Sequence, residues 1–184
     1  LRSMLSAYFY SKDGVFHFEL LKNIKQFPDQ KLFKNLGIDT DNELNVVKNY
    51  VKVQEEINKR DGKSVRFLKT HSSLNDINGH KFTNLENTLG AIHIVRDPRD
   101  IMRSYANQAS ISEEEAKNRI LEIITIGGKK DKKNKTVIHT GSWLTNYISW
   151  KQFKKTNKYL LMRFEDLTSE PEKNFLTILE FVHK

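Results

Sequence analysis

Two short segments of the sequence bring together residue types that bind anions and move protons. In the first, residues 67–73, Lys69, Thr70 and His71 follow a predicted strand. A histidine just beyond a strand end is well placed to act as a general base, and a nearby lysine can stabilise developing negative charge. A lone histidine in this position is also common as an ordinary polar loop residue, so the segment alone leaves both interpretations open.

The second segment runs from Ile92 to Tyr105 and contains Arg96 and, eight residues later, Ser104. Arg96 is predicted at the C-terminal end of a buried strand, where open α/β sheets bind their ligands. Ser104 is predicted two turns into the following helix. An arginine fork, a hydroxyl and the amides of a helix start suit a phosphate group. The alternative is a capped helix start with surface arginines that bind nothing.

The elements that position these residues follow from hydrophobic periodicity and capping signals. Apolar runs at 65–69, 89–95 and 159–163 predict strands. Helices are predicted over residues 2–10 and about 44–60, and a further helix starts at Pro98. Three more are predicted: one from the cap at Ser112 through Ile124, one over 142–156, and one from the cap at Ser169 to Val182. Capping signals are predicted at Thr40–Glu43, Asp97-Pro98, Ser112–Glu115 and Ser169–Glu172. Short apolar strands that alternate with helices predict the α/β class, with a parallel sheet covered on both sides, in a single domain over residues 1–184.

Composition excludes several classes of protein. The 184 residues carry 31 Lys and Arg against 23 Asp and Glu, a formal net charge of +8, but the lysines are scattered. The dense run Lys129–Lys135 is either a solvated loop or a lid that attracts an anionic acceptor. No apolar run approaches the roughly 20 residues that cross a bilayer. The chain has no cysteine, which excludes disulfides and thiolate sites and favours a reducing, cytoplasmic location.

Four motifs, spread over residues 69–182, together resemble the family of sulfotransferases that use 3′-phosphoadenosine 5′-phosphosulfate (PAPS), with bacterial members the most similar in character. Lys69-Thr70-His71 matches the family's Lys-Thr-His signature. Arg96 followed by Ser104 matches its 3′-phosphate-binding segment. The Gly-Ser-Trp helix and the strand after it correspond to Gly141-Ser142-Trp143 and Leu161–Leu167. The order and spacing of the four motifs are more specific than any one of them.

The resemblance implies a three-layer sandwich with a central parallel sheet, and transfer of a sulfuryl group from PAPS to a hydroxyl or amine of a small-molecule or saccharide acceptor. It implies that His71 is the general base, that Lys69 neutralises charge on the transferred group, and that Arg96 and Ser104 hold the 3′-phosphate. Phe164 stands where the family has an aromatic ring, usually tyrosine, that stacks on adenine; core packing is the alternative. Protein cations can stabilise this charge alone, so no metal is expected.

The resemblance to the family starts at a helix, Leu1–Tyr10, that other family members place after their first strand and loop. Family members have a first strand and a Lys-Ser-Gly-Thr-Thr-Trp-like loop before the helix that resembles Leu1–Tyr10, and some have an Arg-Lys-Gly loop near the C-terminus. We therefore expect a fold that is incomplete at both ends and a longer natural protein. Residues 1–184 alone should be poorly soluble and inactive, because loss of a central strand leaves backbone groups unpaired.

Two other functions remain open at this stage. A nucleoside or nucleotide kinase of similar architecture would need a phosphate loop and a carboxylate that binds magnesium. A basic, non-enzymatic nucleic-acid-binding module would need a continuous basic stripe, which the scattered lysines do not predict. We expect neither nucleic acid nor a membrane as partner. Trp143 and Tyr147 are candidates either for an acceptor pocket or for the core, and the sequence indicates neither the acceptor nor the oligomeric state.

Overall fold

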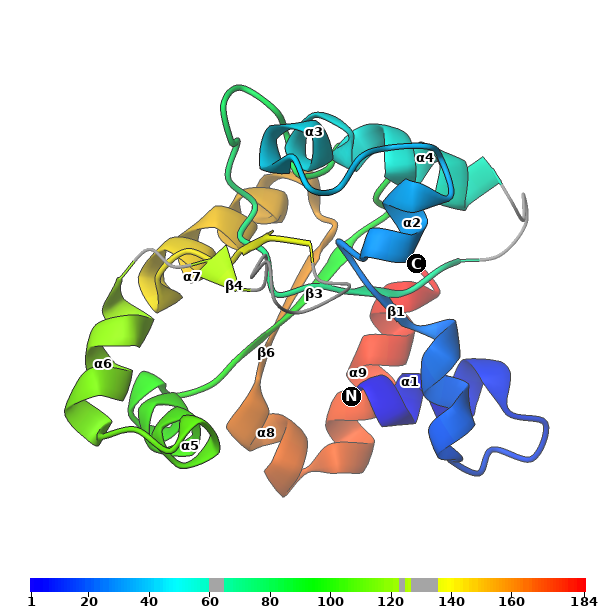
Figure 1. The fold of residues 1–184 in the computed structure, drawn as a ribbon. Coiled ribbons are helices and arrows are strands. Elements are labelled where there is room, and N and C mark those ends of the chain that lie inside the picture. The colour runs from blue at the N-terminus through cyan, green and yellow to red at the C-terminus, as the bar shows by residue number, and fades with distance from the viewer. Residues whose placement is uncertain (60–64, 123–124, 127–135) are drawn as a thin grey trace. The chain divides into compact units, whose positions relative to one another are not determined.

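The computed structural model describes residues 1–59, 65–122, 125–126 and 136–184 (Figure 1). The chain forms two compact units. The first contains Leu1–His71, Ile77–Thr83 and Gly127–Ile138, and the second contains Ser72–Asp76, Asn84–Ile126 and His139–Lys184. The division falls directly after His71. The predicted base and its lysine therefore belong to the first unit, and the predicted nucleotide-binding residues belong to the second.

The first unit is built around a short parallel strand pair. The strand β1 (Lys25–Gln26) pairs with β2 (Leu68–Lys69), so that Gln26 lies opposite Lys69. The helix α1 (Arg2–Tyr10) contacts the 3-10 helix η1 (Phe18–Asn23), which leads into β1. The other helices of this unit are α2 (Gln30–Lys34), α3 (Glu43–Lys48) and α4 (Tyr50–Lys59). The predicted helix over residues 2–10 is confirmed, whereas the predicted strand over 65–69 is only two residues long.

An aromatic cluster forms the core of the first unit. The rings of Phe27, Phe33, Tyr50 and Phe82 are almost fully buried, with centroids 5.2–6.2 Å apart in their contacting pairs. Burial of each such ring contributes about 1.5–3 kcal/mol. Phe27 directly follows β1, and its amide donates a hydrogen bond of 2.7 Å to the Lys69 carbonyl. The cluster therefore fixes the strand pair that ends at Lys69.

The capping prediction at Thr40–Glu43 is wrong in detail. The N-cap of α3 is Asn42, whose side chain accepts a hydrogen bond from the Asn45 amide at 3.3 Å. The Thr40 hydroxyl instead accepts from Gln30 Nε2 at 2.9 Å. The predicted long helix is also divided into α3 and α4 at Asn49, whose side chain donates to the Asn45 carbonyl. Asparagine competes with the helix for backbone partners, which explains the break.

The second unit contains the longer parallel pair. The strand β3 (Ala91–Val95) pairs in register with β6 (Tyr159–Arg163), from Ala91 opposite Tyr159 to Val95 opposite Arg163. Figure 1 shows these strands side by side. The predicted α/β class with parallel strands is confirmed. The remaining elements are α5 (Pro98–Ala109), α6 (Glu113–Leu121), β4 (Thr125–Ile126), β5 (Ile138–His139), α7 (Trp143–Lys151), η2 (Gln152–Thr156), α8 (Phe164–Ser169) and α9 (Pro171–Val182).

Two predicted helix caps of this unit are confirmed and one is wrong. Asp97 and Ser112 are the N-caps of α5 and α6, and each accepts a hydrogen bond from an amide of the first turn. Ser169 does not cap α9: its hydroxyl donates to the Asp166 carbonyl, and Glu170 is the N-cap without a side-chain hydrogen bond. The strand β3 also starts two residues later than predicted, because Leu89 is 69% exposed.

A half-buried polar pair links the two long strands. His93 Nδ1 and the Tyr159 hydroxyl are 2.8 Å apart, and the rings of Tyr147 and Trp150 from α7 lie 6.0 and 6.5 Å from the imidazole. Burial lowers the pKa of His93 to about 4 and raises the pKa of Tyr159 to about 12. Trp143 stacks on Tyr147 at 5.6 Å. This packing favours the core interpretation of these aromatic residues over an acceptor pocket.

The His93–Tyr159 pair predicts acid sensitivity of the second unit. The unfolded chain binds a proton at His93 near pH 6.5, whereas the folded chain binds it only near pH 4. The free energy of unfolding should therefore be highest above pH 6.5 and should fall as the pH drops from 6.5 to 4. After allowance for solvent screening of the partly exposed ring, we expect a loss of about 1–2 kcal/mol.

Urea unfolding at pH 7.5 and 4.5 measures this loss. The double variant His93→Phe, Tyr159→Phe removes the titrating group and leaves no buried hydroxyl unpaired, so its stability should change less between the two pH values. His183→Gln, which removes an exposed histidine of the same unit, is the matched control. A pH dependence of equal size in all three proteins would refute the assignment to His93.

Candidate functional site

Lys69 and His71 lie at and just beyond the end of β2 in the first unit. Burial lowers the pKa of His71 below its ordinary value of 6.5, and the positive charge of Lys69 lowers this pKa further. Burial likewise lowers the pKa of Lys69, and the positive charge of Arg2 adds to this effect. The imidazole of His71 is therefore neutral at pH 7 and able to accept a proton.

In the second unit, the register of the parallel pair brings two predicted binding residues together. Because Val95 lies opposite Arg163, the next residues along the chains are Arg96 and Phe164. The guanidinium carbon of Arg96 lies 4.8 Å from the centroid of the Phe164 ring, which is a cation–π contact. Phe164 is 37% exposed, so its ring is not fully enclosed in the core. Arg96 Nε is buried and has no hydrogen-bond partner.

Arg96 differs in its charge partners from the arginines around it. The neighbouring arginines each lie within ion-pair distance of a carboxylate: Arg99 of Asp97 at 2.6 Å, Arg103 of Asp100 at 3.9 Å, and Arg163 of Glu165 and Asp166 at 3.8 and 3.9 Å. Among the residues that the structure describes, Arg96 forms no ion pair. Arg96 is therefore a partly buried cation with no carboxylate within ion-pair distance in the part of the chain that the structure describes.

The start of α5 is already capped from within the chain. The Asp97 carboxylate accepts hydrogen bonds from the Arg99 amide and guanidinium, and these interactions lower its pKa to about 2. The Asp97 amide donates to Glu165 Oε1 at 3.0 Å. Asp97 therefore occupies one of the amides of this helix start. Ser104 is exposed on the second turn of the same helix.

The predicted site residues fall into two groups. Lys69 and His71 belong to one compact unit, and Arg96, Ser104 and Phe164 belong to the other. In the described residues, His71 follows a strand of the β1–β2 sheet and Arg96 follows a strand of the β3–β6 sheet, so an arrangement of both at one edge of a single sheet is not observed. The single-domain organisation stays a prediction. The basic run at Lys129–Lys135 lies outside the described residues.

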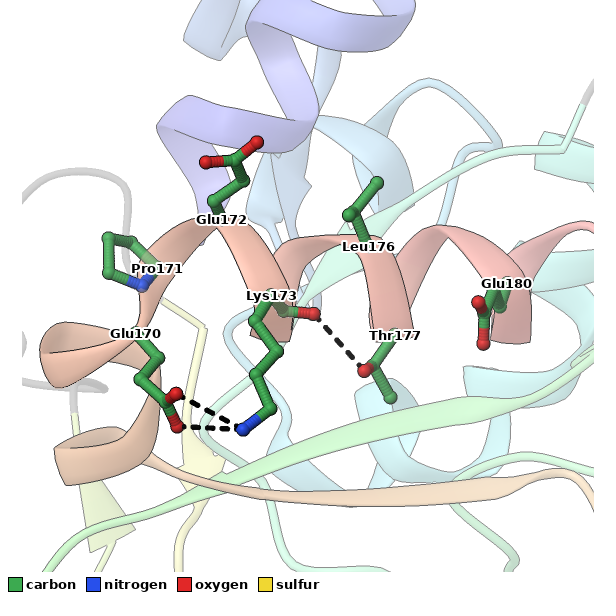
Figure 2. A pocket seen from close by; sticks show the side chains of 7 residues that line it. All are labelled: Glu170, Pro171, Glu172, Lys173, Leu176, Thr177 and Glu180. Carbon is green, nitrogen blue, oxygen red and sulfur yellow. Dashed lines mark hydrogen bonds and ion pairs between the residues drawn. The ribbon is translucent and has the colours of Figure 1, made fainter.

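A surface depression of about 640 Å³ lies along α9, lined from Glu170 to Glu180. Figure 2 shows that its polar contacts stay within α9 and its N-cap residue: the Lys173 ammonium lies 3.0 Å from the Glu170 carboxylate, and the Thr177 hydroxyl donates to the Lys173 carbonyl. None of the predicted site residues lines it. Exposed residues of a single helix face that already pair with one another do not form a catalytic site, so we assign the depression no function.

Among the described residues, no group of three or more histidine, aspartate or glutamate side chains is arranged to hold a metal ion. No helix in the same part of the chain has the length and apolar character needed to span a membrane. The cytoplasmic location suggested by the cysteine-free sequence stays a prediction.

Comparisons with known proteins agree with the motif analysis. The family model of the sulfotransferase domain matches residues 15–184. Among solved structures, the chain is similar to mouse sulfotransferase SULT7A1 in a crystal structure with PAP, with 19% identity and a TM-score of 0.47. The match covers 70% of this chain and 43% of the mouse protein, so the chain spans less than half of that protein's length. No curated protein sequence matches the chain.

The electrostatic coupling between Lys69 and His71 is testable without an activity assay. Removal of the positive charge in Lys69→Met favours the imidazolium, so the pKa of His71 should rise toward 6.5. An NMR titration of the His71 ring protons measures this pKa. Lys59→Met removes an exposed lysine that is paired with Glu56 in the same unit and is the matched control. An unchanged pKa of His71 in Lys69→Met would contradict the coupling.

Proposed function

Because the chain belongs to the sulfotransferase family, we propose that it transfers a sulfuryl group from PAPS to a hydroxyl or amine of a small-molecule or saccharide acceptor. The observation that carries this proposal is Arg96, a partly buried arginine with an unpartnered Nε and, among the described residues, no ion pair. A buried N–H without a partner costs about 1–3 kcal/mol. A phosphate oxygen would supply the missing acceptor and also neutralise the guanidinium charge.

We assign Arg96 and Ser104 to the 3′-phosphate of the donor. Arg96 directly follows β3 and Ser104 lies on α5, the helix that begins two residues later, so one strand–helix segment supplies both groups. The carboxylates of Asp97, Asp100 and Glu165 are paired with arginines, which reduces their repulsion of an incoming phosphate. A site of this kind selects nucleotides with a 3′-phosphate over ATP.

Phe164 has two functions in this proposal. The Arg96 guanidinium lies over its ring at 4.8 Å, so the ring holds the arginine side chain in place at the strand ends. More than a third of Phe164 remains exposed, which leaves surface on which adenine can pack. Phenylalanine offers the same π-face as tyrosine without the hydroxyl.

The transfer step uses the groups at the end of β2. The acceptor oxygen or nitrogen attacks sulfur while the bond between sulfur and the bridging oxygen of PAPS breaks, releasing PAP. Neutral His71 accepts the proton of the acceptor as the new bond forms. The Lys69 ammonium stabilises the negative charge that develops on the bridging oxygen. Both groups come from residues 69–71, so a short rigid segment positions the acid–base chemistry.

The family match favours this function over a nucleotide kinase and over a nucleic-acid-binding module. Transfer from PAPS through protein cations should continue in the presence of EDTA, whereas phosphoryl transfer by a kinase requires Mg²⁺. The assay is the formation of PAP, followed with and without chelator in the full-length protein.

Variants of His71 and Arg96 should distinguish the general base from the residue that binds the 3′-phosphate. His71→Ala should lower kcat by roughly 10²–10⁴-fold, with PAP affinity nearly unchanged, because a general base acts in the transition state. Arg96→Gln should weaken PAP binding by about 30-fold or more, as loss of a buried charge partner typically does. Arg119→Gln has the same charge change but removes an exposed arginine that is paired with Glu115, and it is the matched control.

Steady-state kinetics with calorimetric titration of PAP distinguishes these outcomes. Equal loss of PAP affinity in His71→Ala and Arg96→Gln would refute the assigned roles. So would a loss of PAP affinity in the Arg119→Gln control as large as in Arg96→Gln.

A further inference from the structure

A second arginine shares the features that set Arg96 apart. Arg2 lies in the first turn of α1, and its Nη2 atom donates to the Leu21 and Ile24 carbonyls at 2.6 and 2.5 Å. Its Nε is buried without a hydrogen-bond partner. No carboxylate within the described ranges forms an ion pair with it. Neutral carbonyls therefore hold the side chain in place, and its positive charge stays unbalanced.

The backbone places Arg2 close to the predicted catalytic lysine. Ile24, one of the two carbonyl partners of Arg2, directly precedes β1. β1 pairs with β2, where Gln26 lies opposite Lys69. The charge of Arg2 is felt at Lys69, whose pKa it lowers. All of these residues belong to the same compact unit, so their arrangement does not depend on the other unit.

Two neighbouring cations without a carboxylate repel one another, which destabilises the protein unless an anion binds between or beside them. The first turn of α1 contains no acidic side chain that would balance this charge. Hydrogen bonds to carbonyls fix the guanidinium but cannot neutralise it. The buried Nε–H of Arg2 also lacks a hydrogen-bond acceptor, which a bound anion would supply.

We propose that Arg2 is a second donor-binding arginine, which together with Lys69 binds the phosphosulfate group at the 5′ end of PAPS. This inference rests on the proposed sulfotransferase function, because it takes the donor as the ligand. Binding of the anion restores the charge balance around Lys69 and supplies the acceptor that Arg2 Nε lacks.

Two nucleotide ligands distinguish the proposed role of Arg2 from that of Arg96. Adenosine 5′-phosphosulfate has the 5′ group without the 3′-phosphate, and adenosine 3′-monophosphate has the reverse. Arg2→Gln should weaken binding of the phosphosulfate about tenfold and leave the 3′-monophosphate unchanged, whereas Arg96→Gln should show the opposite pattern. Glutamine keeps an N–H donor for the Leu21 and Ile24 carbonyls while it removes the charge. Arg119→Gln is the charge-matched control.

The variant Arg2→Lys, with thermal unfolding of each variant, distinguishes loss of the positive charge from loss of folding stability. Lysine retains the positive charge, so Arg2→Lys should bind the phosphosulfate better than Arg2→Gln, whatever the melting temperatures of the two variants. If Arg2→Gln loses both nucleotides equally, or if neither variant changes phosphosulfate affinity, the inference is wrong. If the unsubstituted protein binds neither nucleotide, the proposed function itself fails. Normal binding of both nucleotides with an effect of Arg96→Gln alone would retain the function and exclude Arg2.

Discussion

The contact between Arg96 and Phe164 is the interaction on which the proposed donor site depends, and it is a consequence of strand register. β3 and β6 pair without offset, so the residues that follow them emerge side by side, and the guanidinium lies over the ring. A shift of one residue would move each side chain to the other face of the sheet. The His93–Tyr159 hydrogen bond and the α7 aromatic rings hold the same strand pair. Packing remote from the site therefore determines the position of its central cation.

Charge pairing gives this protein a consistent electrostatic pattern. Its surface arginines, such as Arg99 and Arg119, lie against carboxylates, and such exposed pairs contribute little to stability. Arg2 and Arg96 have other partners, carbonyl oxygens in one case and an aromatic ring in the other. Those partners orient a guanidinium without cancelling its charge. Each unit thus contains one oriented cation, Arg2 in the first and Arg96 in the second, and the first unit also contains the neutral histidine.

The sequence was sufficient for only part of the structure that is decided locally, because the caps predicted for α3 and α9 are displaced to Asn42 and Glu170. Asp97 and Ser112 are N-caps as predicted, because capping involves only the following turn. It was insufficient where partners are distant: Lys25–Gln26 forms a strand only through pairing with β2, and no apolar pattern marks it. The contact of Arg96 with Phe164 joins residues 68 positions apart. The carbonyl partners of Arg2 lie 19 and 22 residues away. Motif order could indicate Arg96, but no motif indicates Arg2.

The state of the Arg96 Nε proton tests the central claim most directly. Its ¹H–¹⁵N signal, assigned by its loss in Arg96→Lys, reports whether an acceptor binds this N–H. Addition of PAP should shift the signal and slow its exchange with water, because a 3′-phosphate oxygen accepts the hydrogen bond. Addition of 5′-AMP, which lacks that phosphate, should leave it unchanged. A signal that saturating PAP does not move, or that both nucleotides move equally, would contradict the assignment of Arg96 as the 3′-phosphate anchor.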